Sequence, residues 1–182
     1  MVIDNFIDSY SELKELSLTC DFQDLENPSD GVIYPNIFAN IPEQIKSDIL
    51  VKLEEITSNK PKDITMFMRM SPSGVYCPHK VHHDLVMGNM SLMLYLNDGD
   101  GGTSFVKHNE TGIAYAPVSR IFSNIIEADQ NNPEQWTITE SVKMKQNRAL
   151  IFDASRMHCA EPIGGFGENQ KDARIVLTCF FS

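Results

Sequence analysis

A histidine and an aspartate two residues apart are the first candidates for chemistry in this sequence. They are His82 and Asp84, with His83 between them. In an extended strand, residues two apart point to the same face, so His82 and Asp84 can share one ligand while His83 points away. An imidazole and a carboxylate, completed by a distant second imidazole, form a facial triad that holds a divalent metal and leaves other positions open. The pair predicts a metal site, and the alternative is a solvated turn at Asp84.

The third ligand must come from elsewhere in the chain, where His108 and His158 are the candidates. His79 and His83 belong to the cluster around the first ligand, and we interpret both as surface residues. His158 follows the apolar stretch 149–152, which predicts a strand that leads to the site. His108 ends another short stretch among polar residues, where we expect a solvated histidine. The sequence therefore favours His158.

The elements that position these residues are predicted to be two helices followed by short strands. An apolar stripe predicts a helix over residues 42–57, and a weaker pattern predicts another over 4–16. Residues 20–40 are rich in Asn, Asp and Pro, which is typical of an irregular connection. Beyond residue 60, turn residues separate β-prone stretches at 64–70, 81–85, 91–96, 103–107, 136–144, 149–152 and 174–181.

This order of elements predicts a mainly β fold, an antiparallel jelly-roll with helices on one outer face. The 182 residues leave room for a single domain over 1–182, with helical support in 1–60 and the β core in 61–182. The net charge of −10 argues against a groove-bound nucleic acid. No apolar run is long enough for a membrane span, and neither the cysteine spacing nor the start of the chain indicates secretion. We therefore expect a cytoplasmic protein with reduced thiols.

Several segments, in order, resemble the prolyl-hydroxylase branch of the iron(II)- and 2-oxoglutarate-dependent oxygenases, whose core is a cupin-like double-stranded β-helix. The likeness extends over residues 66–181. It comprises His82-x-Asp84, Leu92–Asn97 with the turn Gly101-Gly102, Asn147–Phe152 with His158–Pro162, and Arg174–Phe181. The resemblance implies that His82, Asp84 and His158 hold Fe(II) as the catalytic centre, with 2-oxoglutarate and O2 as co-substrates.

The resemblance also implies a binding site for the free carboxylate of 2-oxoglutarate. Arg174 matches the basic residue of the family's last strand, and a guanidinium grips a carboxylate through two charge-assisted hydrogen bonds. Tyr95 matches a strand position whose phenol helps to bind the same carboxylate, and Thr103 could point a hydroxyl into that region. The alternatives are an edge-strand surface charge for Arg174 and a core aromatic for Tyr95.

Three features depart from the family pattern. His158 and Arg174 lie 16 residues apart, more than the usual interval, and the added residues fall within the Gly-rich stretch 163–173. Arg69 and its neighbouring methionines stand where relatives often carry a tyrosine, and Arg69 could face the substrate. Residues 112–135 are longer than compact members need. Each long segment is either a lid or a surface excursion.

The function implied by the resemblance is hydroxylation of an amino-acid side chain, free or within a polypeptide, with release of succinate and CO2. Asp84 argues against the halogenating relatives, which carry Ala or Gly at that position. We expect a small-molecule or peptide substrate and neither a nucleic-acid nor a membrane partner. Two alternatives stay open: a cupin-like metalloenzyme that does not use 2-oxoglutarate, and a non-catalytic binding module on the same fold. The substrate and the oligomeric state do not follow from the sequence.

Overall fold

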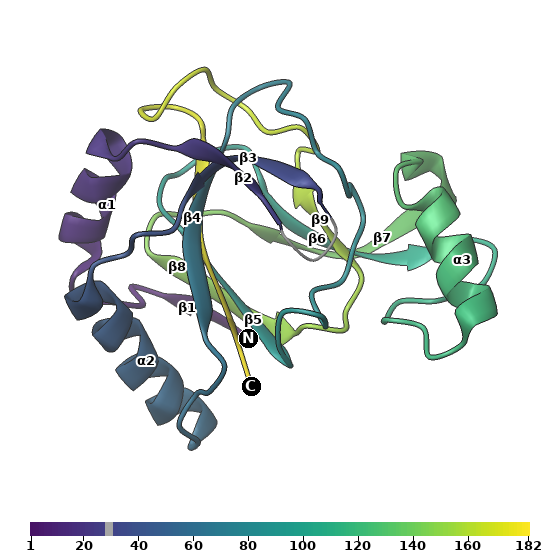
Figure 1. Ribbon diagram of the computed structural model, residues 1–182, viewed down its shortest axis with the longest axis horizontal. Coiled ribbons are helices and arrows are strands. Elements are labelled where there is room, and N and C mark those ends of the chain that lie inside the picture. The colour runs from purple at the N-terminus through teal and green to yellow at the C-terminus, as the bar shows by residue number, and fades with distance from the viewer. Residues whose placement is uncertain (28–30) are drawn as a thin grey trace.

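Two antiparallel sheets form the centre of the computed structural model, which describes residues 1–27 and 31–182 (Figure 1). Within these residues the larger sheet has seven strands, ordered β1-β8-β5-β10-β4-β3-β2, and the smaller has three, ordered β7-β6-β9. The strands are β1 (Val2–Asp4), β2 (Gln23–Glu26), β3 (Ile33–Phe38), β4 (Thr65–Ser71), β5 (Met90–Tyr95), β6 (Gly102–His108), β7 (Trp136–Lys143), β8 (Arg148–Asp153), β9 (His158–Glu161) and β10 (Arg174–Phe181). The helices are α1 (Tyr10–Thr19), α2 (Glu43–Thr57) and α3 (Arg120–Asp129), with a short 3-10 turn at Pro133–Gln135.

The larger sheet is apolar on both faces. Its outer face packs under α1 and α2, which lie on the left in Figure 1, through residues that include Leu13, Ile49, Leu53, Leu92, Leu94 and Leu177. Its inner face meets the smaller sheet through Tyr95, Phe105, Val142, Met144, Leu150, Phe152 and Val176. Fully burying one such side chain contributes about 1.5–3 kcal/mol, so both layers stabilise the fold. Against this apolar background, the polar side chains on the inner face are candidates for a functional role.

The helix predicted over 42–57 is confirmed as α2. Its buried side chains, Ile45, Ile49 and Leu53, recur every four residues and form the stripe that faces the sheet. The helix predicted over 4–16 begins later, at Tyr10, because residues 2–4 form β1 and pair with β8. Residues 1–60 thus supply the two expected helices and also three strands of the larger sheet.

The prediction of an irregular connection over 20–40 is wrong for most of that segment. β2 and β3 pair with each other, and β3 continues the sheet beside β4. Residues 28–30 lie outside the described residues. The polar composition hid these strands because β2 is exposed along its whole length at the sheet edge.

Most of the strands predicted beyond residue 60 are confirmed, with one exception and one addition. Residues 81–85 form no strand and contribute only an isolated bridge at His82. β9, which begins at His158, was not predicted. Within 112–135 the chain forms α3, which lies on the far side of the molecule from α1 and α2 (Figure 1). In the part of the chain that the structure describes, no helix combines the length and apolar character needed to cross a membrane.

Candidate metal centre

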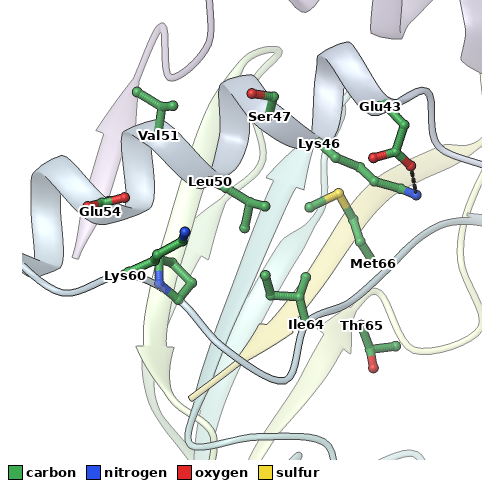
Figure 2. Close-up of a pocket in the computed structure, with 11 residues that line it drawn as sticks. Glu43, Lys46, Ser47, Leu50, Val51, Glu54, Lys60, Ile64, Thr65 and Met66 are labelled. Atoms are coloured by element: carbon green, nitrogen blue, oxygen red, sulfur yellow. Dashed lines mark hydrogen bonds and ion pairs between the residues drawn. The ribbon is translucent and has the colours of Figure 1, made fainter.

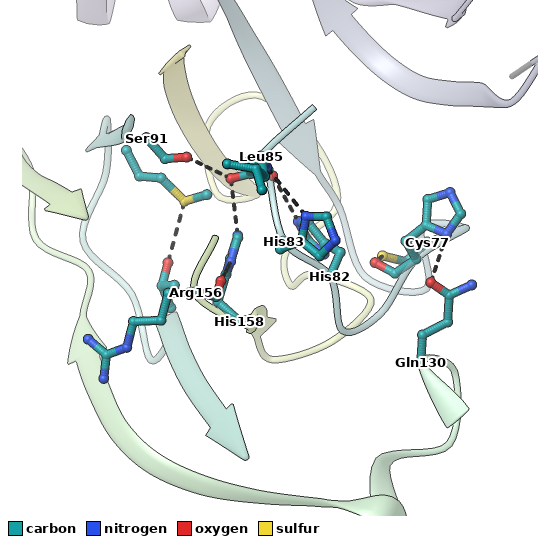
Figure 3. Close-up of polar contacts among 12 residues, drawn as sticks. Cys77, His82, His83, Leu85, Ser91, Gln130, Arg156 and His158 are labelled. Atoms are coloured by element: carbon teal, nitrogen blue, oxygen red, sulfur yellow. Dashed lines mark hydrogen bonds and ion pairs between the residues drawn. The ribbon is translucent and has the colours of Figure 1, made fainter. Parts of the chain in front are cut away.

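His82, Asp84 and His158 come together between the two sheets. Their possible ligand atoms all lie within 4.8 Å of one another. Asp84 Oδ2 is 3.4 Å from His158 Nε2, and Asp84 Oδ1 is 3.7 Å from His82 Nε2. Figure 3 labels His82, His158 and Ser91, and each of these three side chains contacts the Asp84 carboxylate. The structure therefore joins the three ligands predicted from the sequence.

Backbone pairing brings the distant histidine to the first motif. The amide N–H of His82 donates to the carbonyl of His158 at 3.0 Å, and that of His158 donates back to His82 at 2.9 Å. Two residues later, the amide of Asp84 donates to the carbonyl of Ala154 at 2.7 Å. The carboxylate thus reaches the site from a turn that follows the bridge. The strand predicted over 81–85 is absent. His82 and Asp84 nevertheless face the same site, as that prediction required.

Hydrogen bonds around the ligands orient their free atoms. His158 Nδ1 lies 2.9 Å from the carbonyl of Arg156, which fixes the proton on Nδ1 and leaves a lone pair on Nε2. Nε2 is buried and has no hydrogen-bond partner among the described residues. Ser91 Oγ donates to Asp84 Oδ2 at 2.9 Å. Sequence reasoning missed both supports, because neither a backbone carbonyl nor a lone serine has a distinctive pattern.

The site favours a neutral imidazole at His82. Burial holds the pKa of His82 well below its usual range, and the neighbouring His158 lowers it further. The two rings lie 4.4 Å apart between centroids, and Phe152 packs edge-on against His158 at 4.9 Å. A neutral imidazole is the form that binds a metal ion.

The donor set fits a divalent metal ion. The three side chains offer two imidazole nitrogens and a carboxylate oxygen within 4.8 Å of one another, so they could hold one ion between them. Without an ion, His158 Nε2 would be a buried acceptor that nothing satisfies, and such groups are costly. Two imidazoles and one carboxylate on one side of an ion are the ligand set of non-haem iron(II) sites.

The remaining histidines do not join this group. His83 points elsewhere, and its Nδ1 accepts a hydrogen bond from the amide of Leu85 at 3.4 Å. His79 contacts Gln130 through Nδ1 at 3.2 Å. The expectation of a solvated His108 is wrong, since this side chain is fully buried.

His108 belongs to a structural cluster of its own. Its Nε2 lies 3.0 Å from Asp129 Oδ2, its Nδ1 lies 2.9 Å from Thr111 Oγ1, and its ring packs against Trp136. The Trp136 indole N–H donates to the carbonyl of Asp129 at 3.0 Å. These contacts attach the end of α3 to β6 and β7.

The end of α3 also holds the chain that leads into the first ligand. The amide of Val81 donates to the carbonyl of Gln130 at 3.0 Å, and the amide of Lys80 donates to Asn131 Oδ1 at 3.0 Å. The Asn131 side-chain amide donates to the carbonyl of Pro78 at 3.1 Å. The segment 112–135 therefore supports the residues immediately before His82.

Arg174, Tyr95 and Thr103 form a second polar group between the sheets. The Tyr95 hydroxyl donates to Thr103 Oγ1 at 2.8 Å, and the Arg174 guanidinium lies 6.0 Å from the centre of the Tyr95 ring. Arg174 Nη2 donates to the carbonyl of Gly102 at 3.1 Å. Burial raises the pKa of Tyr95 and lowers that of Arg174. The three predicted residues are therefore neighbours in a dry environment.

Arg174 is a buried cation in need of an anion. Its side chain is 5% exposed, its Nε has no hydrogen-bond partner, and no carboxylate among the described residues forms an ion pair with it. An unpaired buried charge costs several kcal/mol, whereas a carboxylate ligand would offset that cost. The interpretation of Arg174 as an edge-strand surface charge is wrong, because β10 lies between β4 and β5.

The segment 163–173 lies against the end of β4. The amide of Phe166 donates to the carbonyl of Ser71, and the amide of Ser73 donates to the carbonyl of Gly167. Asp172 Oδ1 accepts hydrogen bonds from two amides within the segment. The added residues between His158 and Arg174 thus form a folded loop. His158 remains at the start of β9, and Arg174 remains at the start of β10.

A groove far from these groups is lined by α2 and the chain before β4. Its volume is about 740 Å³, and Figure 2 shows Lys46 and Glu43 paired at one end of it. None of the candidate ligands lines this groove. It lies on the helical side of the larger sheet, so we assign it no part in the metal chemistry.

The fold is shared with solved structures at low sequence identity. The chain is similar to a prolyl-4-hydroxylase from Pseudomonas putida, with a TM-score of 0.51, 16% identity, and coverage of 100% of this chain and 90% of that chain. It is similar to EctD from S. alaskensis with 2-oxoglutarate and 5-hydroxyectoine, with a TM-score of 0.53, 10% identity, and coverage of 98% and 70%. It is similar to SnoN, the non-heme alpha-ketoglutarate-dependent epimerase from nogalamycin biosynthesis, with a TM-score of 0.55, 11% identity, and coverage of 100% and 76%.

Two further matching structures are longer, and the chain spans 62% of their length. At these identities the likeness establishes the fold, which is the double-stranded β-helix of the 2-oxoglutarate oxygenases, as predicted from the sequence. A search of curated proteins by sequence found no match. A family model described as a family of unknown function, DUF6445, matches residues 1–181.

Proposed function

This chain belongs to DUF6445, a family of unknown function, and from the geometry of its metal centre we propose that it is an iron(II)- and 2-oxoglutarate-dependent oxygenase. In this proposal it hydroxylates an amino-acid side chain, free or within a polypeptide, and releases succinate and CO2. The prolyl-4-hydroxylase and EctD structures, which have the same fold, support hydroxylation as the reaction class. SnoN has the same fold and is an epimerase, so the product must be identified directly.

One observation carries the proposal: three side chains that could hold a metal ion, and a buried arginine without a carboxylate partner, both project between the two sheets. Ser91, which supports Asp84, and Tyr95, which adjoins Arg174, lie on the same face of β5. Four residues of strand separate them by about 13 Å. Side chains reach inward from both ends, so a short dicarboxylate bound to the metal would extend toward the arginine.

Each residue then has a defined task. His82, Asp84 and His158 hold the ion on one side and leave its other positions free. The guanidinium of Arg174 binds the far carboxylate of 2-oxoglutarate. Thr103 has a hydroxyl proton available, since its present acceptor is the weakly accepting sulfur of Met93 at 3.6 Å.

The chain also supplies a dry environment. Phe105 and Phe152 are nearly fully buried beside His158, and burial strengthens the charge interactions of the bound dicarboxylate. When bound, iron and 2-oxoglutarate supply the oxidation of a substrate C–H bond at the expense of O2. In this proposal the substrate is a small molecule or a peptide.

The test is anaerobic spectroscopy of the apoprotein with iron(II) and 2-oxoglutarate. An α-keto acid chelated to iron(II) gives a visible charge-transfer band, and we expect a band that requires both reagents. His82→Ala should abolish it, and Arg174→Met should raise the 2-oxoglutarate concentration needed by about 100-fold or more, consistent with loss of a buried charge pair. Arg120→Met is the matched control, because Arg120 is exposed on α3.

The outcomes separate the proposal from its alternatives. A folded, iron-loaded protein without the band would refute the 2-oxoglutarate assignment and favour a cupin-like metalloenzyme. A folded protein that binds no metal would favour a non-catalytic binding module. If the band forms, succinate release with candidate amino acids and peptides, and a product that gains one oxygen atom, would establish hydroxylation.

A further inference from the structure

A second arginine faces the same interior without a counter-ion. Arg69 lies on β4, opposite Val176 of β10, and Val176 in turn lies opposite Tyr95 of β5. Directly opposed residues of neighbouring strands point to the same face of a sheet. Arg69 therefore projects from the inner face, on the other side of Val176 from Tyr95.

Arg69 is close to Arg174. Burial is the main cause of the lowered pKa of Arg174, and the positive charge of Arg69 lowers it further. Its Nε is buried without a hydrogen-bond partner, and no ion pair involving it occurs among the described residues. Two guanidiniums thus share a space in which neither has a carboxylate partner.

A charge count distinguishes the two arginines. A divalent ion, Asp84, Arg174 and doubly negative 2-oxoglutarate together have no net charge, so the proposed metal and co-substrate leave nothing to balance Arg69. One further negative charge would complete the site. The exposed fractions of the two arginines also support different ligands for them. Arg174 is 5% exposed, whereas Arg69 is only partly buried and remains accessible to a ligand from solvent.

We infer that Arg69 binds a carboxylate of the substrate, so that the enzyme acts on a compound with a carboxylate close to the carbon that is oxidised. This inference rests on the proposed function. It names a substrate class, which is a free amino acid or a peptide that presents a carboxylate at its C-terminus or on an Asp or Glu side chain. It also assigns Arg69 to the substrate and Arg174 to the co-substrate.

The first experiment asks which ligand Arg69 serves. The anaerobic charge-transfer band is titrated with 2-oxoglutarate in the wild type, Arg69→Gln, Arg174→Gln and the exposed control Arg120→Gln. We expect the affinity of Arg69→Gln for 2-oxoglutarate to stay within about threefold of the wild type, while that of Arg174→Gln falls about 100-fold. An equal loss in both variants would overturn the assignment of Arg69 while leaving the proposed function intact. Absence of the band in the wild type would instead refute the proposed function.

The second experiment tests the carboxylate. Free L-amino acids, their carboxamides, and blocked tripeptides with an Asp or Glu side chain or a free C-terminus are added to the anaerobic iron and 2-oxoglutarate complex. Binding is read from the perturbation of the band and from the rise in melting temperature. The expected result is an acid that binds about tenfold or more tightly than its amide, a preference lost in Arg69→Gln and partly kept in Arg69→Lys.

Each outcome of this panel either supports or overturns the binding of a substrate carboxylate by Arg69. Preference for a free amino acid or for a peptide acid identifies which source supplies the carboxylate. Amides that bind as well as acids, or no binding by any acid at millimolar concentration, would overturn the inference. Circular dichroism and the intact band confirm that Arg69→Gln is folded, so loss of the preference cannot come from unfolding.

Discussion

His82 and His158 exchange both of their backbone hydrogen bonds, although 76 residues separate them in the sequence. The pairing places the two imidazoles by main-chain geometry, before any metal binds. A metal ion would then join side chains whose backbones are already paired, so little reorganisation would accompany binding. The support of Asp84 by Ser91 adds a third fixed position.

Removal of the Ser91 hydroxyl should weaken metal binding. Ser91→Ala deletes the hydrogen bond that orients Asp84, and the loss of such a support typically costs about 10- to 100-fold in metal affinity. Mn(II) or Fe(II) binding to the apoprotein, measured by calorimetry, checks this prediction. Ser123→Ala on α3 is the control. Unchanged affinity in Ser91→Ala would show that Asp84 needs no such orientation.

The hydroxyls near Arg174 should tune co-substrate affinity modestly. Thr103→Val removes a donor next to Arg174, and one neutral hydrogen bond contributes about 1 kcal/mol. We therefore expect 2-oxoglutarate binding to weaken about fivefold, far less than in Arg174→Met. Titration of the charge-transfer band measures both variants. A loss in Thr103→Val as large as in Arg174→Met would contradict the division of roles.

The cluster around His108 should stabilise the fold without affecting the metal site. Asp129→Ala leaves the buried Nε2 of His108 unpaired, at a cost of about 1–3 kcal/mol in the free energy of unfolding. Urea denaturation measures this cost, with Glu127→Ala on the exposed face of α3 as the control. Metal affinity at low temperature should remain. A change confined to metal binding would mean that His108 serves the site instead.

The ion pairs of Asp4 should make stability depend on pH. Hydrogen bonds from Arg148 and then from Lys145 hold the pKa of the Asp4 carboxyl well below its usual range. A carboxyl whose pKa is depressed in the folded state contributes stability above its unfolded pKa of about 3.9, and that contribution is lost as the pH falls below it. Asp4→Asn should therefore lower the melting temperature at pH 7 and have a shrinking effect toward pH 3. A difference that does not vary with pH would exclude the ion pairs as its origin.

The candidate metal ligands could be predicted from the sequence because their residue types and order are distinctive. His82 and Asp84 are adjacent in the pattern, and His158 follows a strand that is plain from its apolar residues. The sequence predicts a strand at 81–85, whereas the structure has a single bridge and a turn. The same side chains converge because the carbonyl of Ala154 fixes the backbone of Asp84.

The rest depended on contacts that local pattern does not encode. The polar residues next to His108 in the sequence are typical of a solvated histidine. Its burial is explained only by the contact with Asp129, which lies on α3. β2 and β3 have the composition of a loop, and they form strands because β3 pairs with β4 and β2 pairs with β3. The face of the sheet from which Arg69 projects follows only from the pairing of β4 with β10.

The attachment of Gln130 and Asn131 to residues 78–81 constrains any redesign of this protein. α3 is an attractive element to exchange when altering selectivity, since it lies apart from the helical layer and has Ile121 and Phe122 exposed. A graft that replaced the whole segment would also remove the anchor of the chain that enters the first ligand. Chimeras that retain Gln130 and Asn131 should bind iron(II) as the wild type does, whereas those cut beyond them should bind it more weakly even though no candidate ligand has been changed.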